Sequence, residues 1–198
     1  TADAVIWRFV PLAALLVGCA AGHIRPGVPA STVSSEQNDS IVVWRADGRV
    51  AVQRGDEGWS ATLRWHQRPA GFQLRLIAPL GRGTYQLAGD DAEVELLAPD
   101  GRRFYASDPE SLMAEHLGWS IPVSGAQYWL RGLVAPGPPP SSIRRDEAGR
   151  LQDVQQAGWR ISVLRHMRVG DFELPAKLYL QYQNLKVRIV VSSWKLRP

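Results

Sequence analysis

Hydrophobic and polar residues alternate along most of the chain from Val43 onward. In residues 59–66, tryptophan, alanine, leucine and tryptophan alternate with serine, threonine, arginine and histidine. The same period of two recurs in residues 72–78, 93–96, 159–164, 177–182 and 186–191. Because successive side chains of a strand point to opposite faces, this pattern predicts antiparallel strands that are buried on one face.

Short turn-forming sequences separate these segments. They are Asp47-Gly48, Asp90-Asp91, Asp100-Gly101, Gly149 and Gln156-Ala157-Gly158. The Asp-Gly pair at 100–101 is the strongest hairpin signal, since both residue types tolerate the left-handed backbone of a tight turn. Many short strands joined by turns predict a meander that folds as a sandwich or a barrel.

Two segments break the alternation and predict short helices. Asp108, Pro109 and Glu110 supply an N-cap, a first-turn proline and a first-turn acid, and Gly118 follows as a stop signal. Ser124 predicts the start of a second helix, which would carry the apolar residues up to Leu133. Two such helices can cover the apolar face of a sheet. A tight cover would give a core and a loose cover would give a cavity, and the pattern fits both.

The first part of the chain has the order of a secretory signal. Arg8 precedes the apolar run Phe9–Val17, which ends in Leu16-Val17-Gly18-Cys19. We therefore expect a signal peptide over 1–18, because the run is shorter than the roughly 20 residues of a spanning helix. The alternative is a buried helix with Cys19 as a small core residue. Residues 19–42, rich in small and helix-breaking residues, predict a flexible tether, with a short helix around Thr32–Ile41 as the alternative. Residues 43–198 form the predicted folded domain.

Composition narrows the classes of function. The net charge of +4 favours contact with anionic headgroups or an acidic partner. The basic residues are scattered rather than clustered in a nucleic-acid-binding motif, so we expect no nucleic-acid partner. The four histidines have no metal-ligand spacing, and no nucleophile or phosphate-binding motif is present. We therefore expect neither a metal site nor an enzyme.

Short sequences in a fixed order resemble the LolB family of outer-membrane lipoprotein receptors, from Val43 to Trp194. They are Gly48-Arg49-Val50, Trp65-His66-Gln67, Ala78-Pro79-Leu80-Gly81, Ala106-Ser107-Asp108, Ile121-Pro122-Val123, Tyr128-Trp129-Leu130-Arg131-Gly132-Leu133, Gly149-Arg150-Leu151, Gly158-Trp159 and Trp194. The sequence that ends in Cys19 resembles the bacterial lipobox, whose cysteine receives lipid and becomes the mature N-terminus. Ala20 resembles the residues that permit export to the outer membrane in Gram-negative bacteria.

The resemblance implies a mainly β fold with short helices. The implied architecture is an incomplete antiparallel β-barrel with a helical lid enclosing a hydrophobic cavity. It further implies a monomer that is anchored in the outer membrane by lipid on Cys19 and faces the periplasm. The family takes lipoproteins from the periplasmic carrier LolA and inserts them into the inner leaflet of the outer membrane. No ATP is implied at this step, and no cofactor apart from the covalent lipid.

Two groups of residues take roles from this resemblance. The loop Pro79-Leu80-Gly81 would present an exposed apolar residue that promotes release of cargo into the membrane. The alternative is that Leu80 folds back onto the core. Inward-facing residues would line the acyl-chain cavity, each of them alternatively an ordinary core position. They are Leu63, Trp65, Leu74, Leu76, Leu87, Leu96, Trp129, Ile161, Val163, Leu178, Leu180, Ile189 and Val191.

Two departures and two other functions complete the expectations. The tether lacks a clear long leading helix, which leaves open how that edge of the barrel is covered. Ser124-Gly125-Ala126 is small where the family would place a bulkier apolar residue, which predicts a weaker lid contact or a wider cavity. An acyl-chain-binding or scaffold outer-membrane lipoprotein would share the barrel without handing cargo over. A periplasmic hydrolase would need a polar triad, for which the sequence offers no set of residues. An exposed Leu80 with an apolar cavity favours the receptor over the hydrolase.

Overall fold

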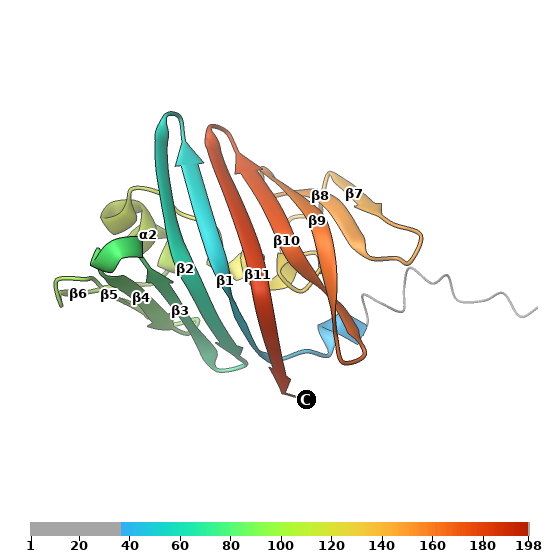
Figure 1. Cartoon of the computed structure of the whole chain (residues 1–198), viewed down its shortest axis with the longest axis horizontal. Coiled ribbons are helices and arrows are strands. Elements are labelled where there is room, and N and C mark those ends of the chain that lie inside the picture. The colour runs from blue at the N-terminus through green and yellow to red at the C-terminus, as the bar shows by residue number, and fades with distance from the viewer. Residues whose placement is uncertain (1–36, 198) are drawn as a thin grey trace, which may run out of the picture.

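The computed structural model of the chain describes residues 37–197, and within them eleven strands form one antiparallel sheet (Figure 1). The predicted signal peptide 1–18, Cys19 and the tether up to residue 36 lie outside the described residues. The strands are β1 Val43–Arg54, β2 Glu57–Arg68, β3 Gly71–Ile77, β4 Thr84–Gly89, β5 Val94–Leu97, β6 Arg103–Ala106, β7 Ser142–Arg145, β8 Leu151–Gln156, β9 Trp159–Val169, β10 Phe172–Tyr182 and β11 Leu185–Arg197.

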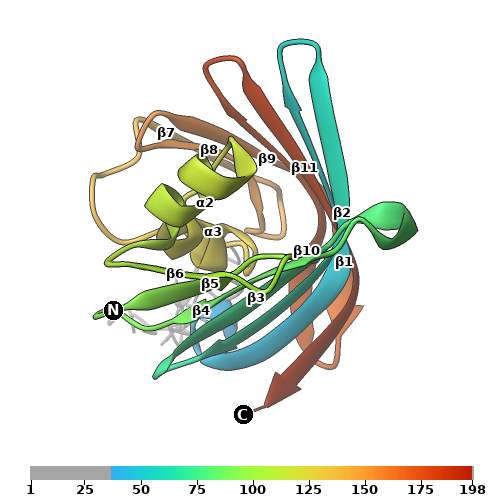
Figure 2. The same ribbon diagram turned by 90° about the vertical axis from the view of Figure 1, so that its left-hand side faces the viewer.

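Two meanders meet in the centre of the sheet. The strand order is β6-β5-β4-β3-β2-β1-β11-β10-β9-β8-β7, so every pair joins sequence neighbours except the pair of β1 with β11. The sheet curls around the helices and stays open between β6 and β7, as Figure 2 shows. The predicted mainly β fold with an incomplete antiparallel barrel is confirmed.

The two predicted helices lie on the concave side of the sheet (Figure 2). The first, α2, spans Pro109–Leu117 as predicted. Its N-cap Asp108 accepts a hydrogen bond from the Ser111 amide at 2.8 Å, and Gly118 ends the helix with φ +78°.

The second helix, α3, spans Val123–Trp129. The predictions that Ser124 begins it and that it carries residues up to Leu133 are wrong, because the helix ends at Trp129 with Leu130 as its C-cap. The carbonyl of Pro122 already accepts the amide of Ala126 at 2.7 Å, so Pro122 is the N-cap. Ser124 lies inside the first turn, where amides have no intrahelical partner, and its backbone amide hydrogen-bonds the carboxyl group of Glu110 instead. Its hydroxyl makes no capping hydrogen bond.

The prediction of a turn at Asp47-Gly48 is also wrong, because both residues lie inside β1. The register between β1 and β11 shifts between them, which marks a β-bulge. A Cβ at Gly48 would overlap the carbonyl oxygen of Val190 on β11, so only glycine permits this approach. An Asp-Gly pair suits a bulge as well as a turn. The other predicted turns, including the hairpin at Asp100-Gly101, lie between strands, except that Gln156 is the last residue of β8 and only Ala157 and Gly158 form that turn.

The concave face and the two helices share one hydrophobic core. The predicted alternation is confirmed in β2, where Ala61, Leu63 and Trp65 are buried and the residues between them are exposed. Trp44 packs against Trp65 and Trp194, with ring centroids 5.6 and 5.3 Å apart. No helix within residues 37–197 has the length and apolar character needed to cross a membrane.

Candidate functional site

The thirteen residues predicted to line a cavity come together on the concave side. They lie on seven strands and on α3, all of them belong to the same core cluster, and none is more than 7% exposed. The fold therefore gathers them under the two helices.

A buried amide holds the lid to one side of the sheet. Gln156, at the end of β8, is 4% exposed and accepts hydrogen bonds from the indole Nε1 of Trp129 and from the amide of Ala135. Its own Nε2 donates to the carbonyls of Ala135 and Pro138 at 2.6 and 2.9 Å. One side chain thus connects α3, the proline-rich loop after it and the sheet. All four of these hydrogen-bonding groups would lose a partner if Gln156 were apolar.

The small residues of α3 have a local explanation. The indole of Trp129 folds back over Gly125, where a Cβ would lie 3.2 Å from two ring atoms. The space left by the missing side chain is therefore occupied by the ring of Trp129. Gly125 allows a large aromatic residue four positions later to pack against its own helix.

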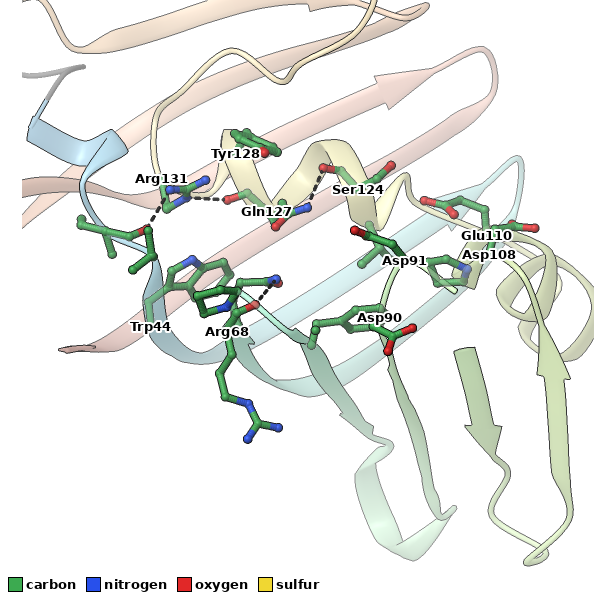
Figure 3. A pocket seen from close by; sticks show the side chains of 18 of the residues that line it. Trp44, Arg68, Asp90, Asp91, Asp108, Glu110, Ser124, Gln127, Tyr128 and Arg131 are labelled. Carbon is green, nitrogen blue, oxygen red and sulfur yellow. Dashed lines mark hydrogen bonds between the residues drawn. The ribbon is translucent and has the colours of Figure 1, made fainter. Parts of the chain in front are cut away.

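A groove opens between α3 and the adjoining ends of β1, β2 and β3 (Figure 3). Its volume is about 480 Å³. Ile41, Trp44 and Val123 form an apolar floor and are each at most 3% exposed. The rim carries charged side chains, which are Arg68, Asp90, Asp91, Asp108, Glu110 and Arg131. Because Trp44 also contacts the central tryptophans, the groove leads from solvent to the edge of the core.

Glu110 couples the two lid helices electrostatically. It lies in the first turn of α2, where burial raises the pKa of its carboxyl group above the ordinary value for glutamate. Backbone hydrogen bonds from Val123 and Ser124, in the first turn of α3, act in the opposite direction and lower this pKa. Its Oε1 is buried and has no hydrogen-bond partner among the described residues. The carboxyl group of Glu110 in α2 is thus hydrogen-bonded to the first turn of α3.

Arg131 fastens the segment before β1 to the end of the lid. The residue is 6% exposed, donates to the carbonyls of Ile41 and Gln127 at 2.8 and 3.2 Å, and lies 4.9 Å from the ring centre of Tyr128. Asn38 in turn donates to the carbonyl of Arg131 at 2.8 Å. Burial lowers the pKa of Arg131. Residues 38–41, the end of the predicted tether 19–42, are thus bound to the domain.

The loop with Leu80 projects from the convex side of the sheet, opposite the helices (Figure 2). It connects β3 to β4 through a 3₁₀ turn, Pro79–Gly81, and the amide of Ala78 donates to the carbonyl of Gly83 at 3.0 Å to close it. Leu80 is 93% exposed, which confirms the predicted exposure. Its φ of +56° and ψ of +36° lie in the left-handed region, which costs a leucine about 1 kcal/mol. An exposed apolar residue in an unfavourable conformation indicates a functional position.

The sequence alone did not point to the groove residues. The alternation around Trp44 in residues 44–52 could have placed it on the inner face. No comparable signal marks Arg131 or Glu110, since their partners come from distant segments. Across residues 37–197, no three histidine, cysteine or acidic side chains gather where they could hold a metal ion.

Comparison with known proteins adds a family and a fold. The chain matches the family model of outer membrane lipoprotein LolB over residues 43–194. It is 40% identical to the outer-membrane lipoprotein LolB of Nitrosococcus oceani over 153 residues, which cover 77% of this chain and 76% of that protein. It is 34% identical to the LolB of Cellvibrio japonicus over 188 residues, with 93% of each chain covered.

A solved structure has a similar fold at much lower sequence identity. A LolA superfamily protein from Nitrosomonas europaea superimposes with a TM-score of 0.51 at 8% identity, over 85% of this chain and 94% of that one. At this identity the likeness concerns the fold alone.

Proposed function

Because this chain belongs to the family of outer membrane lipoprotein LolB, we propose that it is a lipoprotein receptor of the outer membrane. It accepts lipoproteins from a LolA-type periplasmic carrier and inserts them into the inner leaflet of the outer membrane. It acts as a monomer, and lipid on Cys19 holds it in that membrane with the domain facing the periplasm. It is a binding protein rather than an enzyme.

The observation that carries this proposal is the separation of two apolar features on opposite sides of one sheet. The concave side collects thirteen buried apolar side chains beneath two helices, with a groove at one end. The convex side presents Leu80 to the surroundings. A receptor needs both features, one to shield acyl chains and one to contact the membrane.

Acyl chains require shielding because water disfavours each methylene group by about 0.8 kcal/mol. The concave residues offer an apolar environment, and the groove over Trp44 gives a way in. Since these residues are buried beneath the helices α2 and α3, a shift of the helices would open them to cargo. Transfer from carrier to receptor and on to the membrane then follows the differences in affinity, without ATP or a cofactor.

Leu80 carries the last step in this proposal. Its side chain enters the leaflet and lets bound acyl chains follow, with Pro79 and Gly81 holding it at the tip of the loop. Leu164 on β9 provides a matched control, because it is 58% exposed but lies on a strand rather than on a projecting loop.

The test is a transfer assay with a chain that begins at Ala20. Such a chain keeps every strand and both helices of the described domain together with their core, so it folds without the lipid. It is mixed with LolA that carries a lipoprotein, recovered by pull-down and then offered vesicles. We expect cargo to move onto the protein and then into the vesicles.

Variants separate the two steps of the assay. Leu80→Glu should accept cargo normally and fail to insert it, whereas Leu164→Glu should complete both steps. Normal insertion by a folded Leu80→Glu protein would contradict the role of the loop. Cargo that stays on a competent carrier would contradict handover and favour an acyl-chain-binding or scaffold lipoprotein.

A further inference from the structure

A second groove lies on the convex side, directly beside the Leu80 loop. Its volume is about 590 Å³. Its wall on one side is the start of the loop, Ile77–Pro79, and its base consists of residues on β1, β2 and β11. Two arginines line it, Arg49 from β1 and Arg188 from β11. Figure 1 shows these three strands side by side on the face towards the viewer.

The strand register places the two arginines next to each other. Arg49 pairs with Val190, and Arg188 pairs with Ala51, so the two side chains are diagonal neighbours on adjacent strands and share the convex face. The row that contains Arg49 continues outward through Val190 to Lys177 on β10, and Lys177 pairs with Arg165 on β9. The groove therefore opens onto a row of basic residues.

The acids nearby do not neutralise this pair. Asp47, on the same strand as Arg49, is engaged by Arg45 at 3.0 Å and by Arg64 at 4.0 Å. Asp153, farther along the sheet, is paired with Arg144. Among the described residues, neither Arg49 nor Arg188 makes an ion pair, and both are exposed. Neighbouring like charges disfavour the folded state, so the arrangement points to an anion from outside the chain.

We propose that this groove binds the phosphate of an anionic phospholipid headgroup in the membrane that Leu80 enters. The inference rests on the proposed function and adds the lipid group that the receptor contacts in the membrane. Guanidinium groups bind phosphate oxygens through paired hydrogen bonds, and two of them lie at the foot of an apolar tip. An apolar residue that enters the leaflet and basic residues at headgroup level form the usual pair of signals for membrane contact.

This contact sets the orientation of the receptor. With Leu80 in the leaflet and the arginines on headgroups, the convex side faces the membrane. The helices and the groove over Trp44 lie on the other side of the sheet, where a carrier can reach them.

The test measures binding of the cargo-free chain from Ala20 to vesicles by flotation. One set of vesicles contains phosphatidylcholine only, and the other also contains phosphatidylglycerol. The double variant Arg49→Gln/Arg188→Gln should bind the anionic vesicles about 25-fold more weakly at low salt, since each basic residue near such a surface contributes about fivefold. Its binding to phosphatidylcholine vesicles, which depends on Leu80, should not change.

Two further variants control for charge and for folding. Lys195→Gln/Arg197→Gln removes the same charge from the far end of β11 and should leave binding nearly unchanged. Arg49→Lys/Arg188→Lys keeps the charge but loses the paired hydrogen bonds, so its binding should lie between that of the unchanged protein and that of Arg49→Gln/Arg188→Gln. Equal losses in the two glutamine variants, or no loss in Arg49→Gln/Arg188→Gln, would overturn the proposal.

The remaining outcomes identify other ligands. Inorganic phosphate is added at an ionic strength matched with chloride. If phosphate but not chloride releases the vesicles, the groove binds a free anion, and the proposal of a phospholipid headgroup is overturned. Unchanged vesicle binding with reduced uptake of cargo from LolA would assign the surface to the carrier instead. Cargo uptake is measured without vesicles, so a failure of the proposed receptor function is distinguished from a failure of the headgroup site.

Discussion

The indole nitrogen of Trp129 donates a hydrogen bond to the side-chain oxygen of Gln156 at 3.2 Å, and both residues are buried. Trp129 belongs to the lid helix α3 and Gln156 to β8, so a polar contact inside the core determines where the lid lies. Unlike apolar packing, this contact has a defined partner and direction.

Replacement of Gln156 by leucine should loosen the lid. The change leaves the Trp129 indole and the backbone groups of Ala135 and Pro138 without partners. We expect the free energy of unfolding, measured in urea, to fall by about 2 to 3 kcal/mol. Gln73→Leu on the exposed face of β3 is the control, with an expected change below about 0.5 kcal/mol. Equal effects of the two changes would contradict a special role for Gln156.

Leu80→Asn should raise stability while it impairs insertion. Asparagine tolerates the left-handed conformation at this position better than leucine, so the free energy of unfolding should rise by up to about 1 kcal/mol. Insertion of cargo into vesicles should fall because the apolar tip is lost. Leu164→Asn, at a position in a regular strand, should bring no such gain. A less stable Leu80→Asn protein would show that the conformation is not unfavourable for leucine.

Glu110 should make stability fall as the pH rises through the range between the ordinary pKa of a glutamate and the raised pKa of this carboxyl group in the folded protein. The pKa of its carboxyl group is higher in the folded protein than in the unfolded chain. Between these two pKa values the folded state binds more protons than the unfolded state, so a rise in pH favours unfolding. Glu110→Gln should remove this part of the slope and stabilise the protein at neutral pH. Thermal unfolding measured from pH 4 to pH 8 checks the prediction. Glu115→Gln, exposed on the same helix, should leave the slope as it is; a wild-type slope in Glu110→Gln would refute the assignment.

Gly48→Ala should disrupt the central strand pair. A methyl group there would overlap the carbonyl oxygen of Val190, so β1 and β11 would have to separate at the bulge. We expect a loss of about 1 to 3 kcal/mol in the free energy of unfolding. Gly58→Ala in β2 is the matched control, because a Cβ there would have no atom within 4 Å apart from those of its chain neighbours. A similar loss at Gly58 would show that the cost comes from glycine replacement in general.

Local features of the sequence were sufficient to predict most of the elements. Each long strand buries one face, so the period of two marks its side chains directly, as Leu63 and Trp65 show. Asp108 and Gly118 mark the two ends of α2 in the sequence, because capping depends on residues within one turn of the helix end. Asp47-Gly48 and Ser124 misled for the same local reason, since a bulge and a helix interior accept residues that also suit turns and caps.

Features that depend on distant residues could not be predicted in this way. Three such features join segments that are far apart in the sequence. They are the pairing of β1 with β11, the contact of Arg131 with Ile41 and the position of Arg49 beside Arg188. A period of two says which face a residue occupies and not which strand lies next to it. The exposure of Leu80 was anticipated through a resemblance, because the pattern itself fits an exposed or a buried leucine.

The pairing of β1 with β11 gives this domain a high contact order. Its first and last strands form the middle of the sheet, so the central ladder can assemble only after residue 185 has been synthesised. Until then β1 is a long unpaired edge with an apolar face, open to association with other chains. The two meanders can each form early, and their union is the slow and vulnerable event. A chain cut short within β11 would expose the edges of both halves, and we expect it to aggregate rather than fold.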